Sequence, residues 1–296
     1  MPYLPLRGRP LPFGATPDEK GVNFSLFSKN AVNVIIELFQ NFYDETPIFS
    51  YSFHPVHNKT GDVWHVYLEG VAPGAFYGYR VFGPYLPEFG HRFNPNKLLT
   101  DPYAKANSGE YLWDHEYAYG YDKNAPAKDL SFSDIDSAKS HVKSIVIADD
   151  AFDWEDDKPL RYPMKDTIIY EMHVRLFTKS CRELTKIADP DNHPDETASI
   201  AGTFDGILEK TDHLRRLGVT SIELMPIFEF NPDANIHVHP ETGKRLKNIW
   251  GYDPLAFFSV EASYTPGIGI GEQVRCFKNF VKKMHKAGFE IILDVV

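Results

Sequence analysis

Apolar and polar residues alternate along the first third of the chain. The alternation runs through segments 21–27, 32–38, 64–68 and 77–81, with Pro, Gly, Asn and Asp clustered between them. A period of two is typical of half-buried β-strands, and short strands at this spacing indicate an all-β sandwich. We therefore predict an N-terminal immunoglobulin-like β-sandwich.

After residue 164 the pattern changes to short apolar runs that alternate with helical periodicity. The runs 167–174, 219–227 and 291–296 are rich in β-branched residues, as buried strands are. Apolar residues three and four apart predict one helix over 204–217 and another that includes 274–284, closed by Gly218 and Gly288 respectively.

This order of strands and helices indicates βαβ units in a parallel sheet. The predicted fold class is therefore multi-domain, β followed by α/β, with domains at 1–160 and 161–296. A (β/α)8 barrel needs about 250 residues, more than the second segment holds. We expect that segment to contain the first three strands of a TIM barrel, truncated inside the third.

Charge and composition exclude several classes of function. The formal net charge is −10, whereas a nucleic-acid binder needs a basic surface. No apolar run reaches the roughly 18 residues of a membrane span. Two cysteines are too few for a disulfide framework or a four-thiolate zinc site. We therefore expect a cytoplasmic protein with no nucleic-acid or membrane partner.

Two features of the second segment suggest a binding site. Asp294 is a carboxylate near the end of an apolar strand, where parallel α/β folds build their sites. Without a functional role, this side chain would still require hydrogen bonds in the fold. In the long loop before it, Trp250, Tyr252 and Asp253 surround Gly251. This combination suits an uncharged, hydroxyl-rich ligand.

Other motifs are weaker. The run GIGIG at 267–271 follows a loop rather than a strand, so we interpret it as a helix entry and not as a phosphate-binding loop. His237 and His239 have the spacing of metal ligands on a strand, but no third ligand accompanies them, and we favour a solvent-facing loop. An aromatic-rich connector (Tyr103, Tyr111, Trp113, Tyr117, Tyr119, Tyr121) is either a sugar-stacking platform or, as we favour, a packed connector.

Several segments, taken together, resemble glycogen debranching enzymes and isoamylases of the α-amylase superfamily. PFGAT at 12–16 and GVNFSLFS at 21–28 are similar to the opening of that family's β-sandwich, a carbohydrate-binding-type module. YGYRV at 77–81 and GHRFNPNKLLTDPYAKA at 90–106 are specific to the debranching branch. IYEMHVR at 169–175, LGVTSIELMP at 217–226 and residues 287–296 resemble the first three barrel strands.

The resemblance implies roles for two residues. Tyr252 matches the aromatic residue that stacks on the glucose next to the scissile bond, and Asp294 matches the first aspartate of the superfamily's D-V-V-x-N-H region. With Trp250 and Asp253 beside them, these four are the predicted substrate-binding residues. No residue matches the family's nucleophile, general acid or third aspartate, and we expect those groups beyond Val296.

The resemblance implies hydrolysis of α-1,6 branch linkages in glycogen or a related glucan by a retaining mechanism in a longer parent protein. The 296-residue chain alone is then expected to be inactive. We also expect it to use no metal or other cofactor. One alternative is a branching or glucan-transferring relative on the same scaffold. Another is a non-catalytic glycan-binding protein that uses Trp64, Trp113 and the tyrosines of the connector.

Overall fold

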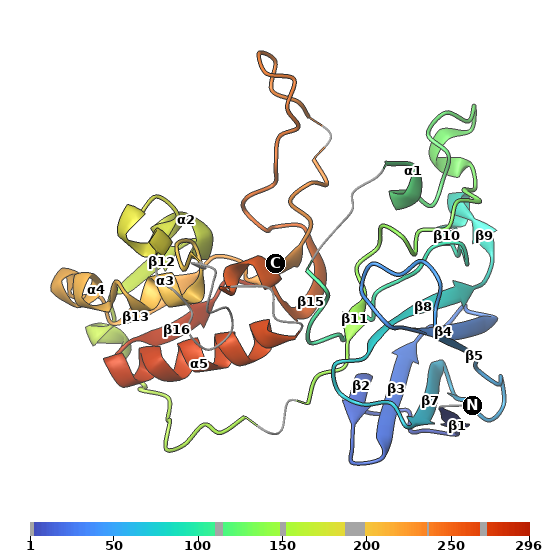
Figure 1. The fold of residues 1–296 in the computed structure, drawn as a ribbon, viewed down its shortest axis with the longest axis horizontal. Helices are drawn as coiled ribbons and strands as arrows, with labels where there is room; N and C mark the ends of the chain where they lie inside the picture. The colour runs from blue at the N-terminus through green and yellow to red at the C-terminus, as the bar shows by residue number, and fades with distance from the viewer. Residues whose placement is uncertain (1–2, 110–114, 149–151, 187–198, 236, 267–270) are drawn as a thin grey trace. The chain divides into compact units, whose positions relative to one another are not determined.

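The computed structural model describes residues 3–109, 115–148, 152–186, 199–235, 237–266 and 271–296 (Figure 1). Contacts within the chain define two units. The first comprises Met1–Ala148 with Ala256–Ser259, and the second Asp149–Leu255 with Val260–Val296. The domain boundary that we place at residue 160 stays a proposal.

The first unit contains two antiparallel sheets. One has the order β1–β7–β3–β2 with β6 paired to β7, and the other has the order β11–β8–β4–β5. Their strands are β1 (Leu4–Leu6), β2 (Gly14–Pro17), β3 (Gly21–Phe27), β4 (Asn33–Phe39), β5 (Phe49–Ser52), β6 (Lys59–Thr60), β7 (Val63–Glu69), β8 (Phe76–Phe82) and β11 (Ser144–Ile145). A small hairpin, β9 (Tyr85–Leu86) with β10 (His91–Arg92), and a short helix α1 (His115–Ala118) follow β8. The predicted β-sandwich is confirmed.

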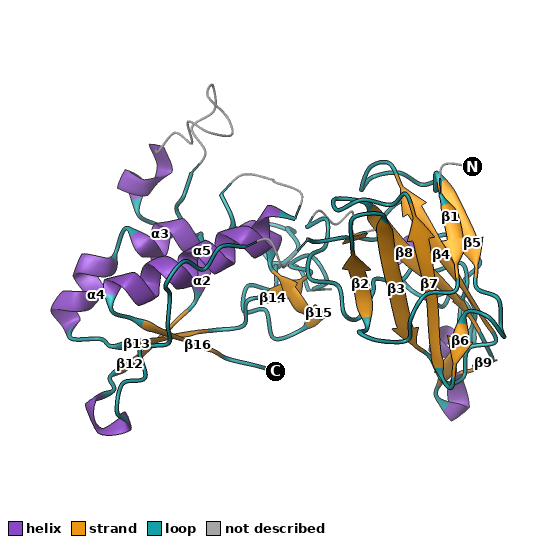
Figure 2. Ribbon diagram, turned by 90° about the horizontal axis from the view of Figure 1, so that it is seen from below, coloured by secondary structure: helices purple, strands orange, loops and turns teal. Residues whose placement is uncertain are grey.

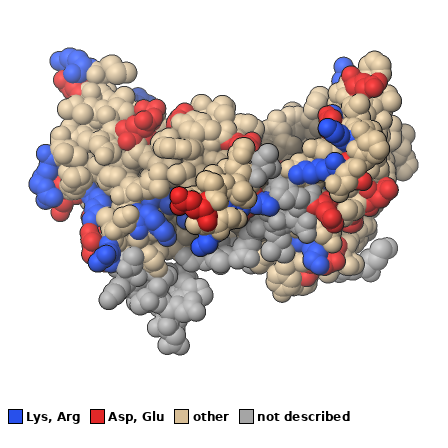
Figure 3. All heavy atoms as spheres, turned by 90° about the horizontal axis from the view of Figure 1, so that it is seen from above, with Lys and Arg blue, Asp and Glu red and all other residues tan. Residues whose placement is uncertain are grey.

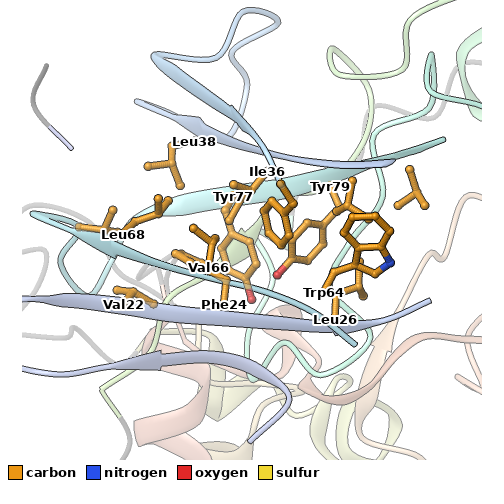
Figure 4. Close-up of a cluster of buried hydrophobic side chains, with 14 of the residues drawn as sticks. Val22, Phe24, Leu26, Ile36, Leu38, Trp64, Val66, Leu68, Tyr77 and Tyr79 are labelled. Atoms are coloured by element: carbon orange, nitrogen blue, oxygen red, sulfur yellow. The ribbon is translucent and has the colours of Figure 1, made fainter. Parts of the chain in front are cut away.

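The core of the sandwich lies between these sheets (Figure 4). Val22, Phe24 and Leu26 of β3 point into it, as the period of two predicts. They meet buried residues of the facing sheet, among them Ile36 and Tyr79. Burial of this apolar surface is the main force that holds the two sheets together.

Long cationic side chains tie the connector after β8 to the sandwich. Arg80 donates to Glu37 at 2.9 Å, to Asp136 at 3.0 Å and to the Pro95 carbonyl at 3.0 Å. Lys97 Nζ donates to the carbonyl oxygens of Tyr117 and Ile135. Because Arg80 and Lys97 are buried, their stems pack against apolar surface while their charged ends bind carboxylate and backbone oxygens. The connector is therefore a packed segment, and its fold depends on charge-assisted hydrogen bonds.

The second unit is built on a parallel sheet with the order β12–β13–β16. The strands are β12 (Ile169–Met172), β13 (Ser221–Leu224) and β16 (Glu290–Leu293). Helices α2 (Val174–Thr178), α3 (Phe204–Leu208), α4 (Thr211–Leu217) and α5 (Glu272–Ala287) lie along one face of the sheet (Figure 2). The remaining pair, β14 (Phe228–Phe230) with β15 (Pro254–Val260), flanks the long loop.

Successive residues of each strand point to opposite faces of this sheet. Met172, Ile222 and Leu224 belong to a core cluster with Phe204 and Phe280 of the helices. The strand residues between them point to the opposite face, as the pleat requires. The predicted start of an α/β barrel is therefore confirmed as a three-stranded parallel sheet without closure among the described residues.

Two sequence predictions in this unit differ in detail from the structure. The single helix predicted over 204–217 is two helices, because the backbone of Lys210 leaves the helical region between them. The strand predicted at 219–227 is only four residues long in β13. Gly218 and Gly288 end their helices at positive φ, 78° and 91°, as predicted, and this conformation favours glycine.

Among the described residues, no helix combines the length and apolar character needed to cross a bilayer. Acidic and basic side chains stand beside each other on the face shown in Figure 3. Exposed ion pairs among the described residues include Lys282 with Glu155 at 2.8 Å and Lys247 with Asp233 at 3.2 Å. Exposed pairs of this kind contribute little stability, about 1 kcal/mol or less.

Candidate functional site

The structure brings together two of the four predicted site residues. Asp294 directly follows β16, and its backbone N–H donates to the Leu224 carbonyl at 2.9 Å. This bond fixes Asp294 at the carboxyl edge of the parallel sheet, where α/β folds place their sites. The Tyr252 hydroxyl donates to Asp294 Oδ2 at 2.7 Å, and this bond raises the pKa of Tyr252.

Trp250 and Asp253 are close to this pair in the sequence, but both line a separate cavity. Together with Asn235, Lys247 and Asn248 they line a cavity of about 490 Å³ in the second unit. Trp250 is about half-exposed, with 50% of its surface accessible, and Tyr252 is similar at 47%. Both aromatic side chains are therefore accessible to a ligand, in contrast to core aromatics.

His173 anchors the loop that carries these residues, and none of the sequence motifs above includes it as a site residue. Its Nδ1 accepts hydrogen bonds from the backbone N–H groups of Arg175 and Leu176, which caps α2. Its Nε2 bonds the Ile249 carbonyl, so the neutral ring with the proton on Nε2 satisfies every contact. Burial of the ring lowers the pKa of His173 and favours this neutral form.

The Trp250 ring also lies near the imidazole. The two ring centroids are 6.2 Å apart in an edge-to-face arrangement. The signal that could have identified His173 is the one used for Asp294, since it is a polar residue immediately after an apolar strand of a parallel sheet.

Two glutamates lie side by side on the face of the sheet away from the helices. Glu171 of β12 is paired in register with Glu223 of β13. Their charges also act on the Tyr252 hydroxyl and contribute to its raised pKa, although less than the bond to Asp294 does. The site at this edge is therefore acidic and aromatic, which suits hydroxyl groups of a neutral ligand rather than anions.

A second pair of glutamates closes the base of the long loop. Glu229 and Glu261 are 2% and 3% exposed, and each accepts a backbone N–H from the other end of the loop. Desolvation raises the pKa of both carboxyls, and the charge of Glu261 raises that of Glu229 further. No sequence pattern predicted this pair.

The weaker sequence motifs have structural explanations where they are described. His239 Nδ1 accepts the backbone N–H groups of Glu241 and Thr242, and it thereby holds a turn. In the part of the chain that the structure describes, no three His, Cys, Asp or Glu side chains gather as metal ligands would. Residues 267–270 of the GIGIG run, together with Tyr111 and Trp113, lie outside the described residues.

The first unit has a larger cavity of about 820 Å³, next to the connector. Its walls include Phe27, Tyr85, Phe93 and Tyr121, with Arg92 and Asp129 among the polar lining residues. Trp64, by contrast, is 1% exposed and belongs to the sandwich core, so it is not available to a glycan. Of the aromatic side chains named for a glycan-binding function, Tyr121 lines this cavity, whereas Trp64 does not.

The sequence matches two family models in the same order as the two parts of the fold. Residues 12–104 match carbohydrate-binding module 48, the isoamylase N-terminal domain, and residues 187–296 match the α-amylase catalytic domain. The chain therefore combines a carbohydrate-binding-module domain with an α-amylase-type catalytic segment.

Curated relatives agree with this assignment. The glycogen debranching enzyme of Erwinia tasmaniensis is 39% identical over 99% of this chain and 40% of its own length. A "glycogen operon protein GlgX homolog" of Mycobacterium tuberculosis is 37% identical over 98% of this chain and 37% of its own length. The chain belongs to the α-amylase superfamily, in the group of the glycogen debranching enzymes. It spans about two-fifths of the length of these relatives.

Solved structures share the fold. The pullulanase of Paenibacillus barengoltzii, in complex with maltohexaose and α-cyclodextrin, has a TM-score of 0.65 at 22% identity and covers 96% of this chain and 38% of its own. The catalytic module of the glycogen-degrading pneumococcal virulence factor SpuA has a TM-score of 0.63 at 23% identity, with 96% and 37% covered. At these identities the likeness supports the architecture of both units.

Proposed function

We propose that this chain supplies the glucan-binding edge of a glycoside hydrolase that cleaves α-1,6 branch linkages in glycogen or a related branched α-glucan. The observation that carries the proposal is the Tyr252–Asp294 hydrogen bond at the carboxyl edge of the parallel sheet. The names of the relatives favour hydrolysis over the alternative of glucan transfer. We further propose a cytoplasmic protein without nucleic-acid or membrane partners.

In this proposal each residue has a role that its geometry allows. The exposed ring of Tyr252 stacks on the apolar face of a glucose unit, while Asp294 orients the tyrosine and accepts a sugar hydroxyl. Trp250 extends the aromatic surface, and Asp253 offers a carboxylate at the neighbouring hollow. These residues bind and orient substrate, and the described part of the chain gives none of them a role as nucleophile or acid.

The retaining mechanism that we propose for the parent enzyme requires two catalytic carboxyl groups in addition to these binding residues. One carboxylate attacks the anomeric carbon and a second carboxyl, about 5 Å away, protonates the leaving oxygen. The acid needs a raised pKa, which an enclosed and partly dry site provides. Glu171 and Glu223 are neighbours, but Glu171 is exposed on an open sheet face. We therefore infer that the catalytic pair is not among the described residues.

The 296-residue chain should release no reducing ends from glycogen. The expected result follows from the open three-stranded sheet, which encloses no carboxyl pair at the proposed site. A reducing-sugar assay measures it, with the full-length Erwinia tasmaniensis relative as the positive control. Measurable turnover by the chain itself would contradict the inference.

Replacing Tyr252 by alanine should weaken binding to branched glucan about tenfold, because a stacking aromatic surface is lost. Tyr252→Phe keeps the ring and loses the bond to Asp294, so it should weaken binding only about threefold. Affinity electrophoresis in glycogen-containing gels measures both effects. If Tyr252→Ala migrates as the unchanged chain does at every glycogen concentration, Tyr252 is not a glucan-binding residue.

A second candidate function is glycan binding by the first unit without catalysis. The 820 Å³ cavity favours it, since its size and aromatic lining are typical of small-molecule sites. The same gels separate the two functions. Loss of retardation in Tyr121→Ala, with Tyr252→Ala unaffected, would favour the binding module, and the reverse pattern would favour the hydrolase site.

A further inference from the structure

The long loop that carries Trp250 and Tyr252 runs between the paired strands β14 and β15, and two carboxyl side chains bond across its base. Glu229 Oε2 accepts the backbone N–H of Ala262 at 3.1 Å, and Glu261 Oε2 accepts the backbone N–H of Phe230 at 3.2 Å. The Glu261 N–H also donates to the Ile227 carbonyl at 2.8 Å. Each end of the loop is therefore bonded to the other through a side chain, and we call these two glutamates the carboxyl clamp.

The carboxyl clamp lies in an unusual environment for two acids. Both side chains are almost fully buried, and in the described part of the chain no Lys, Arg or His forms an ion pair with either. Two adjacent buried carboxylates with no cation paired to either repel each other and lose hydration, so one of them retains a proton at pH values where an exposed acid does not.

The hydrogen bonds identify which carboxyl holds the proton. Glu261 accepts three donors, the N–H of Phe230 together with the N–H and hydroxyl of Ser263. Glu229 accepts one, from Ala262. Donors stabilise the charged form, so Glu261 is the carboxylate and Glu229 is the neutral acid.

The groups around the clamp agree with this assignment. Arg175 of α2 acts on Glu261 and lowers its pKa, while the Tyr264 hydroxyl, from the turn after β15, is a neutral neighbour whose pKa is itself raised by burial. His173, which bonds Tyr264 at 3.5 Å, is neutral as described above. The cationic influence thus reaches Glu261 and leaves Glu229 without a compensating charge.

The clamp is connected to the proposed glucan site. Glu261 begins the turn that holds Tyr264 against His173, and His173 binds the Ile249 carbonyl next to Trp250. Two residues after Trp250, the Tyr252 hydroxyl donates to Asp294. A change in the base of the loop therefore alters the position of both aromatic side chains.

We propose that Glu229 and Glu261 are positioning residues that close the loop carrying Trp250 and Tyr252, and that Glu229 does so in its neutral, protonated form. Loss of that proton places two charges in the buried clamp, which opens the base of the loop and releases segment 237–253. Glucan binding then weakens as pH rises. The part of the inference that concerns glucan rests on the proposed function, whereas the part that concerns loop closure does not.

Hydrogen exchange followed by mass spectrometry tests loop closure directly. Protection of segment 237–253, expressed relative to α5 peptides at each pH, should fall about three- to tenfold between pH 6 and 9, as expected for one lost hydrogen bond. In Glu229→Gln, a neutral side chain that can still accept the Ala262 N–H, protection should stay high across this range. Glu229→Ala should be poorly protected throughout, and Glu241→Gln, on an exposed glutamate of the same loop, should behave as the unchanged chain does.

Glycogen-gel affinity of the same variants, measured at pH 6 and pH 9, tests the link to binding. The unchanged chain should bind about three- to tenfold more weakly at pH 9, and Glu229→Gln should lose this dependence. Protection that is independent of pH in the unchanged chain, or a loop that opens at every pH in Glu229→Gln, would overturn the clamp. A pH-dependent loop with no glycogen retardation would refute the glucan function and leave the clamp supported.

Discussion

Trp64→Ala should lower the free energy of unfolding of the first unit by about 3–5 kcal/mol, the usual range for removal of a buried tryptophan. Trp64 of β7 is 1% exposed, packs in the sandwich core and donates through Nε1 to the Ser28 carbonyl at 3.2 Å. Alanine would leave both a cavity and an unpaired carbonyl. Urea denaturation followed by circular dichroism should show a markedly lower midpoint.

Trp250→Ala is the matched control. This tryptophan is half-exposed, so its loss should change the free energy of unfolding by only about 0.5 kcal/mol. The pair also separates structure from binding, because Trp250→Ala should weaken glucan binding in a chain that remains folded. Equal denaturation midpoints for the two variants would contradict the assignment of Trp64 to the core.

The sandwich could be predicted from the sequence because its strands obey one local rule. Val22, Phe24 and Leu26 alternate with polar residues, and that alone identifies their core face. The same rule predicts polar exposure for Asn23 and Ser25, and there it is wrong. Asn23 bonds the backbone of Arg9 and Ser25 bonds the Pro10 carbonyl, so the N-terminal segment covers this face. A contact with a segment distant in the sequence cannot be predicted from the local pattern of apolar and polar residues.

The same alternation of apolar and polar positions predicts that Trp64 belongs to the core. It lies in phase with Val66 and Leu68 on β7, so the alternation already places it with the core. The interpretation of Trp64 as a glycan-stacking residue used residue type alone and is wrong. Residue type predicts what a side chain can do, whereas its phase along the strand predicts where it lies.

The residues of the proposed site follow from the sequence one by one, but their arrangement does not. The sequence predicts roles for Tyr252 and Asp294 separately, whereas their hydrogen bond joins positions 42 residues apart and depends on the path of an irregular loop. That path is set by His173 and the carboxyl clamp, whose partners are backbone atoms of distant residues. Backbone partners carry no residue-type signal, so sequence motifs cannot reveal such contacts.

A different buried acid should make the first unit lose stability as pH rises through the acidic range. Asp101 is fully buried and accepts the Tyr77 hydroxyl at 3.0 Å and the Tyr103 backbone N–H at 2.8 Å. Burial raises the pKa of Asp101 to about 6, because the hydrogen bonds offset the lost hydration only in part. The folded state therefore binds a proton more tightly than the unfolded state, whose aspartate has a pKa of about 3.9.

The direction of this pH effect follows from the linkage between proton binding and folding. Below about pH 4 both states hold the proton and Asp101 contributes no slope, whereas between about pH 4 and 6 only the folded state holds it, so the free energy of unfolding falls as pH rises. A difference of two pKa units corresponds to about 3 kcal/mol over this interval.

Asp101→Asn cannot titrate and should lose this dependence of stability on pH, while Asp134→Asn, on an exposed aspartate, should keep it. Urea midpoints at pH 4, 5, 6 and 7 measure the effect, and the difference between the unchanged chain and Asp101→Asn isolates this residue from all other titrating groups. If that difference is constant from pH 4 to 7, the folded state holds Asp101 with its ordinary pKa, and burial of this carboxyl is fully offset by its tyrosine and backbone donors.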